Sequence, residues 1–285
     1  MEYARRGFFR GFGLGLTALF IPGCLSNIIE PLFVPRVELW DVWSEHDSRS
    51  TDSVDHREWD RLLKTYVVAG SDGINRFAYS RVSLADLRAL NAYIEQLVGT
   101  SIVRYNRNEQ RAYWINLYNA LTVKVVIEHY PVQTIRDIDL STSPLSSGPW
   151  DHKLVRIGGH DVSLNDIEHR ILRPIWLDPR IHYAVNCAAL GCPNLLPEAF
   201  TAANIDSLMT RAAIEFINHP RGARVVDNGL VVSKIYLWYA EDFGETTEKI
   251  VAHLRSYARP EFALRIHANI LIEDYAYDWS LNDAR

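Results

Sequence analysis

The residues best suited to chemistry are two cysteines, two histidines and a glutamate in the second half of the chain. Glu168 and His169 are adjacent, and His182, Cys187 and Cys192 follow within a short stretch. A cysteine thiolate is a nucleophile, and a histidine within hydrogen-bond reach is the group that most often activates it. This combination predicts cysteine-dependent hydrolysis or acyl transfer, a reaction that needs no cofactor.

The spacing leaves the roles of the two thiols open. Strand alternation places His182 and Cys187, five residues apart, on opposite faces, so His169 is the better candidate for the base. Cys192 precedes a proline and is expected at the start of a helical turn, where the backbone dipole lowers a thiol pKa. Either thiol is therefore a candidate nucleophile.

Two asparagines lie three residues apart on an otherwise apolar segment over 108–129, which predicts a buried helix with Asn116 and Asn119 on one face. An amide is costly to bury without partners. The pair therefore either clamps neighbouring loops or orients His169, as an asparagine does in papain-like sites. Glu168 is not expected to orient its neighbour, since adjacent helical side chains diverge by roughly 100°.

Two alternatives to thiol catalysis use the same residues. His169, His182, Cys187 and Cys192 are ligand types that zinc accepts, although a Cys-x4-Cys spacing matches no standard zinc pattern. The other alternative is a disulfide between Cys187 and Cys192 in an oxidising compartment, with Glu168 and both histidines in a hydrogen-bonded core network. The protein would then be a binding or assembly protein of the cell envelope.

The elements expected to position these residues describe an α+β fold, one domain with a buried central helix and a small antiparallel sheet. Asn108 is the expected N-cap of the central helix. The Asn228-Gly229 pair between branched apolar residues predicts a tight hairpin. Periodicity predicts further helices beginning near Asp55, Ser163, Glu248 and Pro260 and spanning 83–98 and 202–218, and strands over 154–157, 161–163, 180–187 and 270–273.

Three of these segments are expected to converge on one site: the central helix, the helix that carries Glu168 and the run from His182 to Cys192. A catalytic site requires its groups within a few ångströms of one another. Arg180 and Glu109 are further candidates in the same region, as a buried ion pair with a structural role.

Composition narrows the class of protein. The chain has 285 residues, of which 48% are apolar and 23% charged, and this composition favours a folded domain over a disordered chain. The net charge is −5 and the basic residues are dispersed, which argues against nucleic-acid binding. Three cysteines are too few for a disulfide scaffold. We expect one domain over 55–285, after a leader over 1–23 and a lead-in over 24–54.

The N-terminus has the layout of an export signal. Arg5 and Arg6 precede an apolar run over 12–21, which is too short to span a bilayer. The paired arginines resemble the twin-arginine motif, and the sequence before Cys24 resembles a bacterial lipobox, from which Pro22 departs. These features predict an exported, periplasmic protein, anchored to the membrane by acyl chains on Cys24.

Three motifs occur together in this chain: AYWINLYNAL from Ala112, SLNDIEH from Ser163, and DPRIHYAVNCAALGCP from Asp178 to Pro193. In this order, over about 109–216, they resemble the family catalogued as domain of unknown function 547. The resemblance implies an exported bacterial protein with a thiol-hydrolase-like core related to papain or transglutaminase. An envelope protein or peptide would then be the substrate.

Overall fold

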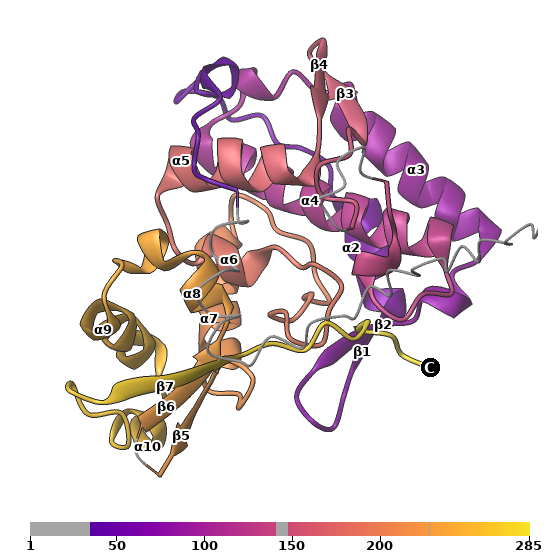
Figure 1. Cartoon of the computed structure of the whole chain (residues 1–285). Coiled ribbons are helices and arrows are strands. Elements are labelled where there is room, and N and C mark those ends of the chain that lie inside the picture. Colours follow the sequence, from indigo (N-terminus) through magenta and orange to yellow (C-terminus); the bar gives the residue numbers. More distant parts are fainter. Residues whose placement is uncertain (1–34, 141–147, 228) are drawn as a thin grey trace, which may run out of the picture.

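The structure, a computed structural model, describes residues 35–140, 148–227 and 229–285 (Figure 1). The predicted leader and the lipidation site at Cys24 lie outside the described residues. Among the residues that are described, no helix is both long enough and apolar enough to cross a membrane.

Helices and small sheets alternate along the chain, which confirms the α+β class. The longer helices are α2 (Arg57–Tyr66), α3 (Leu84–Val98), α4 (Arg107–His129), α7 (Ile205–Ile217) and α9 (Thr247–Tyr257). Short helical turns are η2 (Asp41–Trp43), η3 (Tyr79–Arg81), η4 (Ile102–Arg104), η5 (Ile135–Asp137), α5 (Arg173–Trp176), α6 (Ile181–Ala184), α8 (Ile235–Trp238), η7 (Ala240–Phe243) and α10 (Pro260–Ala263). The segment η6 (Asp166–Leu172) is a π-helix that leads directly into α5.

The strands form three small sheets. The two hairpins are β1 (Val67–Ala69) with β2 (Asn75–Phe77) and β3 (Val155–Ile157) with β4 (His160–Val162), and the third sheet joins β5 (Ala223–Val226), β6 (Gly229–Ser233) and β7 (Leu271–Ala276). The hairpin expected around Asn228-Gly229 is present as β5 and β6. The two hairpins are antiparallel, as expected of a small sheet in this fold, whereas β7 adds to the third sheet by pairing with β6 in parallel.

The helix α4 is the centre of the fold, as its sequence predicted. Its side chains are buried almost continuously from Glu109 to Val126, because helices and loops pack on every side of it. The helix begins two residues earlier than expected. Asn106 is the N-cap, and its side chain accepts the backbone N–H groups of Asn108 and Glu109.

The predicted strand over 180–187 was wrong. Ile181–Ala184 form the helical turn α6, and extended backbone begins at Val185. The Asp178 carboxylate accepts the N–H of Arg180 at 3.0 Å, and its carbonyl accepts that of Ile181 at 3.1 Å, so a helical turn starts here. This segment is buried on all sides, and hydrophobic periodicity does not separate a buried turn from a buried strand.

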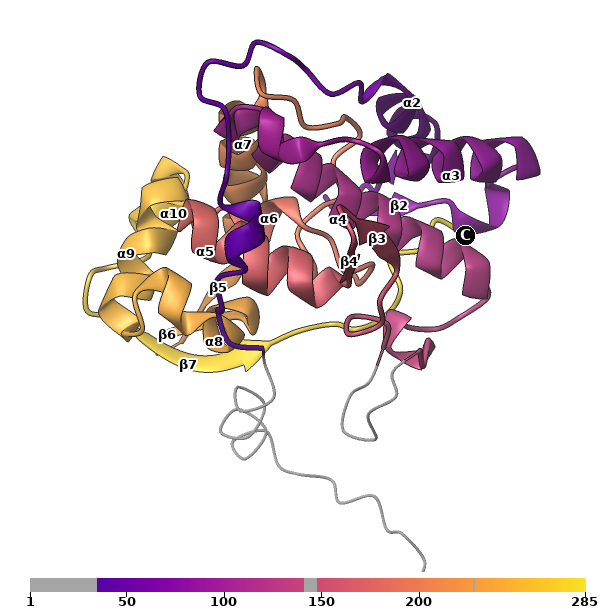
Figure 2. The ribbon, with the colours of Figure 1, turned by 90° about the horizontal axis from the view of Figure 1, so that it is seen from above.

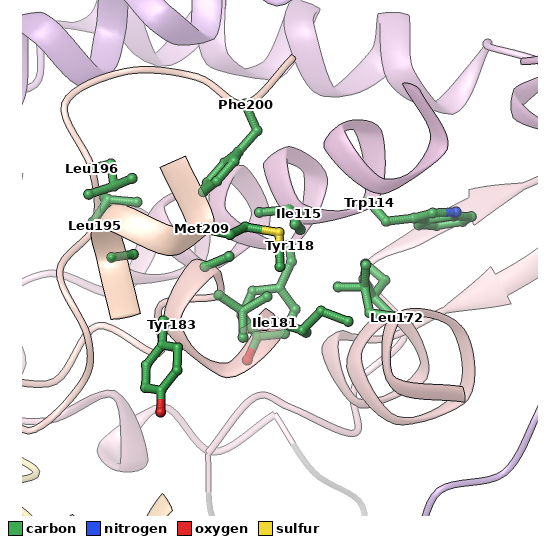
Figure 3. Packing of buried hydrophobic residues seen from close by; sticks show 14 of the residues in the cluster. Trp114, Ile115, Tyr118, Leu172, Ile181, Tyr183, Leu195, Leu196, Phe200 and Met209 are labelled. Atoms are coloured by element: carbon green, nitrogen blue, oxygen red, sulfur yellow. The ribbon is translucent and has the colours of Figure 1, made fainter. Parts of the chain in front are cut away.

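One continuous hydrophobic core surrounds α4. Leu90 and Leu97 of α3 and Met209 of α7 belong to it and are almost fully buried. Figure 3 shows the part in which α4, η6, α6, α7 and the loop before α7 meet, with the labelled side chains Trp114, Ile115, Tyr118, Leu172, Ile181, Tyr183, Leu195, Leu196, Phe200 and Met209. The elements that carry the candidate residues are therefore held by common packing.

The C-terminal segment after β7 runs across the molecule toward the β1–β2 hairpin (Figures 1 and 2). We call residues 277–285 the C-terminal strap. Its backbone forms two hydrogen bonds with Phe77 of β2: the Phe77 N–H donates to the Asn282 carbonyl, and the Phe77 carbonyl accepts the Ala284 N–H. Backbone hydrogen bonds also join the strap to residues 188–191, which places it against the loop that contains both candidate cysteines.

Two amides in α4 tie loops to the core. The Asn116 side chain donates to the Phe200 carbonyl at 2.7 Å and accepts its N–H at 3.1 Å. The Asn119 side chain donates to the Ala184 carbonyl at 2.9 Å and accepts the Asn186 N–H at 2.8 Å. Both amides therefore clamp loops, which is the first of the two roles that the sequence left open.

We expect Asn119→Ala to destabilise the protein by about 2–3 kcal/mol, because it leaves two backbone groups buried without partners. Asn108→Ala is the matched control, since Asn108 is exposed on the same helix, and it should change the free energy of unfolding by less than about 0.5 kcal/mol. Urea unfolding measures both. Equal effects of the two substitutions would contradict the clamp.

Candidate functional site

The π-helix η6 carries Asp166, Glu168 and His169 into the interior. Its backbone bonds run from residue i+5 to residue i, as from the Arg173 N–H to the Glu168 carbonyl. Ser163 and Asp166 form the expected reciprocal cap, with the Ser163 hydroxyl accepting the Asp166 N–H at 3.1 Å. π-Helical segments are rare and are frequently found at functional sites.

Glu168 lies in an interior charged cluster with His182, Arg173 and Asp242. His182 Nε2 lies 2.5 Å from Asp242 Oδ2, and His182 Nδ1 lies 3.5 Å from Glu168 Oε1, an ion-pair distance longer than a well-formed hydrogen bond. Arg173 Nε donates to the same Asp242 oxygen at 2.6 Å. The His182 ring stacks on Tyr239 with centroids 4.2 Å apart. These contacts fix the imidazole on both edges and one face.

The protonation states in this cluster follow from its contacts. Burial alone would lower the pKa of His182, but Asp242 and Glu168 outweigh it and raise the pKa above 6.5. Burial would raise the pKa of both carboxyls, yet the hydrogen bonds from His182 and Arg173 hold Asp242 at a pKa of about 2. For Glu168, the positive charges of His182 and Arg173, and that of His169 where it is protonated, outweigh burial and hold the pKa at about 2. The two carboxylates therefore favour the protonated form of His182, an imidazolium that lies between them.

His169 has a different environment from His182. Its Nδ1 lies 3.0 Å from an Arg173 nitrogen and accepts that bond, so the ring is neutral. Burial lowers the pKa of His169 to about 4, with Glu168 opposing and Arg173 adding to the shift. The ring also lines a cleft of about 250 Å³, together with Lys153 and Arg170. It is thus pinned by a guanidinium rather than paired with a thiol.

The two cysteines form a disulfide. Cys187 is half-buried and Cys192 is buried. The Tyr277 hydroxyl lies 2.9 Å from Cys187 Sγ and 3.2 Å from Cys192 Sγ, and the Cys187 backbone N–H donates to Cys192 Sγ at 3.0 Å. Burial raises the pKa of Tyr277 well above its ordinary value, so its hydroxyl keeps its proton and donates it.

Backbone bonds hold the cysteine loop, residues 187–192, independently of the disulfide. The Leu190 and Gly191 N–H groups donate to carbonyls of the C-terminal strap, both at 2.8 Å. Ala188 has φ +58°, a conformation that costs a non-glycine residue free energy and that its surroundings must enforce. A Cβ on Gly191 would lie 2.6 Å from the Asp278 nitrogen, so the strap approaches closely only because this residue is glycine.

The predicted site residues thus fall into two adjacent centres. Glu168 and His182 meet directly, while Cys187 and Cys192 meet each other. Tyr277 links the centres electrostatically, because the Glu168 charge contributes to its raised pKa. Among the described residues, the hydrogen-bond partners of the two sulfurs are Tyr277 and the Cys187 N–H, and neither histidine contacts a sulfur.

Other predictions about the site change with the structure. Asn119 does not orient His169, because its amide is occupied by Ala184 and Asn186. Arg180 and Glu109 do not pair with each other. Arg180 binds Asp178 at 2.6 Å and Glu109 accepts the Val54 N–H at 3.2 Å, so each has a partner other than the one expected.

Several functional side chains were not singled out from the sequence. Arg173, Tyr239 and Asp242 contact the charged cluster, and Tyr277 contacts both sulfurs. Burial raises the pKa of Tyr118, and the charge of the nearby Glu168 adds to the shift. Arg173 follows His169 by one helical turn, which was the one local signal available. Asp242 and Tyr277 are distant in sequence, and no spacing rule connects them to the site.

The predicted zinc ligands do not form a metal centre in the described part of the chain, where no group of three or more histidine, cysteine, aspartate or glutamate side chains is arranged to hold a metal ion. Cys187 and Cys192 are bonded to each other, and both nitrogens of His182 face carboxylates.

Comparison with protein families confirms the resemblance found in the motifs. The family described as "Protein of unknown function, DUF547" matches residues 102–217, and this part of the chain is similar to that family. The match includes α4, η6, α6, the cysteine loop and α7. No curated protein and no solved structure matches the chain.

Buried neutral histidines predict a loss of stability in acid. Burial lowers the pKa of His56, His169 and His253 from 6.5 to about 4. The unfolded chain therefore binds protons that the folded chain does not as the pH falls from 6.5 to 4, and each histidine lowers the free energy of unfolding by about 1.4 kcal/mol per pH unit.

Urea unfolding across this pH range measures the effect. His56→Gln should reduce the dependence of the unfolding free energy on pH by the contribution of one histidine, since glutamine does not titrate. Glutamine at the exposed His46 is the control. An unchanged slope in His56→Gln would show that this histidine is not buried in its neutral form.

The charged cluster predicts a strong effect of Asp242→Asn. The substitution should lower the pKa of His182, and it should destabilise the protein at neutral pH by about 3 kcal/mol because a buried ion pair loses one partner. The stability that His182 contributes below pH 6.5 is lost as the pH rises through its folded pKa, so this loss should occur at a lower pH in the variant.

Glu241→Gln is the matched control, since Glu241 binds the same Arg173 from a side chain that is 49% exposed. It should cost less than about 1 kcal/mol. Nuclear magnetic resonance titration of the His182 ring and urea unfolding give the two readouts. A His182 pKa unaffected by Asp242→Asn would contradict the assignment.

Proposed function

We propose that this protein is an exported, cysteine-dependent hydrolase or acyl transferase that acts on amide bonds in the cell envelope. The observation that carries the proposal is the convergence of two donors, the Cys187 N–H and the Tyr277 hydroxyl, on Cys192 Sγ. Hydrogen bonds to a charged group favour the charged form. In the reduced protein these donors stabilise a Cys192 thiolate, which is the reactive form of a cysteine.

The reaction proceeds through a thioester. The Cys192 thiolate attacks the carbonyl carbon of the amide, the C–N bond breaks, and the amine leaves with a proton taken from water. The resulting hydroxide, or an acceptor amine, then attacks the thioester carbonyl and releases the thiolate. Attack by hydroxide gives hydrolysis, and attack by an amine gives acyl transfer.

The charged cluster has a positioning role in this proposal. His182 lies on α6, and the chain reaches Cys187 within five residues of it. Its contacts with Glu168 and Asp242 join α6 to η6 and η7, so the origin of the cysteine loop is fixed. Because both histidine nitrogens face carboxylates, His182 holds its proton rather than accepting one from a thiol.

Export belongs to the proposal because a thiol enzyme of the envelope must leave the cytoplasm. Its support is the paired Arg5 and Arg6 and the lipobox-like sequence that ends at Cys24. Intact mass spectrometry of the protein from a membrane fraction tests this. A chain that begins at an acylated Cys24 supports a lipoprotein, and an unprocessed Met1 contradicts export.

One observation favours a second function. The cysteines are joined in the structure, and a disulfide in an oxidising compartment is also found in proteins without catalytic activity. The protein would then be a binding or assembly protein of the envelope, anchored through Cys24. The two functions differ in whether Cys192 reacts as a nucleophile once it is reduced.

We expect the reduced protein to form an acyl adduct on Cys192 when it is treated with p-nitrophenyl acetate at pH 7. Peptide mapping by mass spectrometry identifies the modified residue, and Cys187→Ser should retain the adduct while Cys192→Ser loses it. Each unit by which the thiol pKa falls raises the thiolate fraction up to tenfold, so acylation should be about tenfold faster than in the unfolded chain.

The unfolded chain in urea, at the same pH, is the control for the ordinary reactivity of an activated ester with any thiol. Equal rates in the folded and the unfolded protein would contradict a thiol nucleophile. That result would leave the binding function as the better explanation of the disulfide.

A further inference from the structure

We propose that the Cys187–Cys192 disulfide is a site of thiol–disulfide exchange, at which a dithiol attacks Cys187 Sγ and releases Cys192 as a thiolate. The inference rests on the proposed function, since it names the step that frees the nucleophile. The exchange itself, however, is measurable without any acyl-transfer assay.

Exposure identifies the sulfur that is attacked. Cys187 is half-buried, whereas Cys192 has a relative exposure of 4%. An attacking thiolate must approach the target sulfur along the S–S axis from the far side, and access is one of the determinants of exchange rates. Cys187 is therefore the more accessible of the two cysteines to a thiolate from solution.

Hydrogen bonding identifies the sulfur that leaves. The Cys187 N–H donates to Cys192 Sγ at 3.0 Å. The Tyr277 hydroxyl lies 3.2 Å from Cys192 Sγ and 2.9 Å from Cys187 Sγ, so it serves both sulfurs, and the backbone N–H is the donor that distinguishes Cys192. A thiol of lower pKa leaves faster in thiol–disulfide exchange. Both donors stabilise the negative charge that develops on Cys192 Sγ as the S–S bond breaks. Exposure and hydrogen bonding thus agree that Cys187 Sγ is attacked and Cys192 Sγ leaves.

The loop keeps its shape when the bond is broken. Asn186 Nδ2 donates to the Pro193 carbonyl at 2.8 Å, and this bond spans the same turn as the disulfide. Leu190, Gly191 and Ala188 bond the C-terminal strap, and the Arg221 guanidinium donates to the Leu190 carbonyl at 2.8 Å. The donors to Cys192 are thus held by bonds other than the disulfide, so reduction frees a Cys192 thiolate without unfolding the turn.

The exchange balances in two steps. A thiolate of the dithiol attacks Cys187 Sγ, a new S–S bond forms, and the electron pair of the old bond passes to Cys192 Sγ. The second thiol of the dithiol then loses its proton to water and attacks the dithiol sulfur of the mixed disulfide. Cys187 leaves as a thiolate and takes up a proton. The dithiol is oxidised by two electrons and the protein is reduced by two.

The first test maps the mixed disulfide on the full chain. Brief exposure of the native protein to reduced glutathione, an acid quench and alkylation of free thiols should place glutathione on Cys187 and the alkyl group on Cys192, in at least tenfold excess over the reverse. The reverse assignment, an equal mixture, or a native disulfide that resists glutathione when the unfolded chain does not would overturn the proposal.

The second test measures the leaving group. Tyr277→Phe removes one donor to Cys192 Sγ, and it should slow reduction by dithiothreitol severalfold, whereas Tyr275→Phe, on the same segment and without a sulfur contact, should not. Equal rates in all three proteins would overturn the role of Tyr277. The mapping experiment on the unsubstituted protein remains decisive if Tyr277→Phe does not fold.

The two proposals fail separately. If glutathione maps to Cys187 but the reduced protein forms no acyl adduct, the exchange site stands and the acyl-transfer function falls. If Cys192 is acylated but glutathione maps to Cys192 in the oxidised protein, the function stands and the direction of exchange falls.

Discussion

The Asn119 amide is the contact on which the rest of the site depends. It lies in the middle of a helix buried on all sides, where a side-chain amide is tolerated only if its donor and acceptor are both satisfied. The groups that satisfy it are the Ala184 carbonyl and the Asn186 N–H. They flank the extended backbone that leads to Cys187. A constraint on burial in the core thus fixes the position of the cysteine loop, and the loop in turn places Cys192 under its two donors.

The buried charged side chains and the reactive cysteines occupy different parts of the site. The imidazolium of His182 and the guanidinium of Arg173 balance the carboxylates of Glu168 and Asp242 inside the protein. The contacts of His182 join α6 to η6 and η7. The sulfurs lie in a neighbouring region where the polar partners are neutral donors, the Tyr277 hydroxyl and a backbone N–H. Neutral hydrogen-bond donors lower the pKa of a thiol, and no ion pair with a fixed cation is needed to form the thiolate. The ionic cluster supplies rigidity, and the cysteine loop supplies the chemistry.

The sequence predicted the buried helix, the hairpin after Val226 and the capped start of the Glu168 helix, because each depends on local spacing or on a cap. It did not predict the π-helical conformation, since a π-helix and an α-helix share the same apolar pattern over so few residues. The strand expected around His182 proved to be a helical turn for a related reason: a segment buried on all sides carries no periodicity. Asp242 and Tyr277 could not have been assigned to the site from spacing, because tertiary packing alone brings them there.

The thiol pKa of Cys192 in the reduced, folded protein tests the central claim most directly. Thiolate absorbance in the ultraviolet, followed against pH in Cys187→Ser, reports it without interference from the other loop cysteine. We predict a pKa at least about one unit below the ordinary value of about 8.5, because two donors converge on the sulfur. A pKa at or above the ordinary value would mean that burial outweighs the donors. Cys192 would then be an inert structural cysteine, and the proposed chemistry would be contradicted.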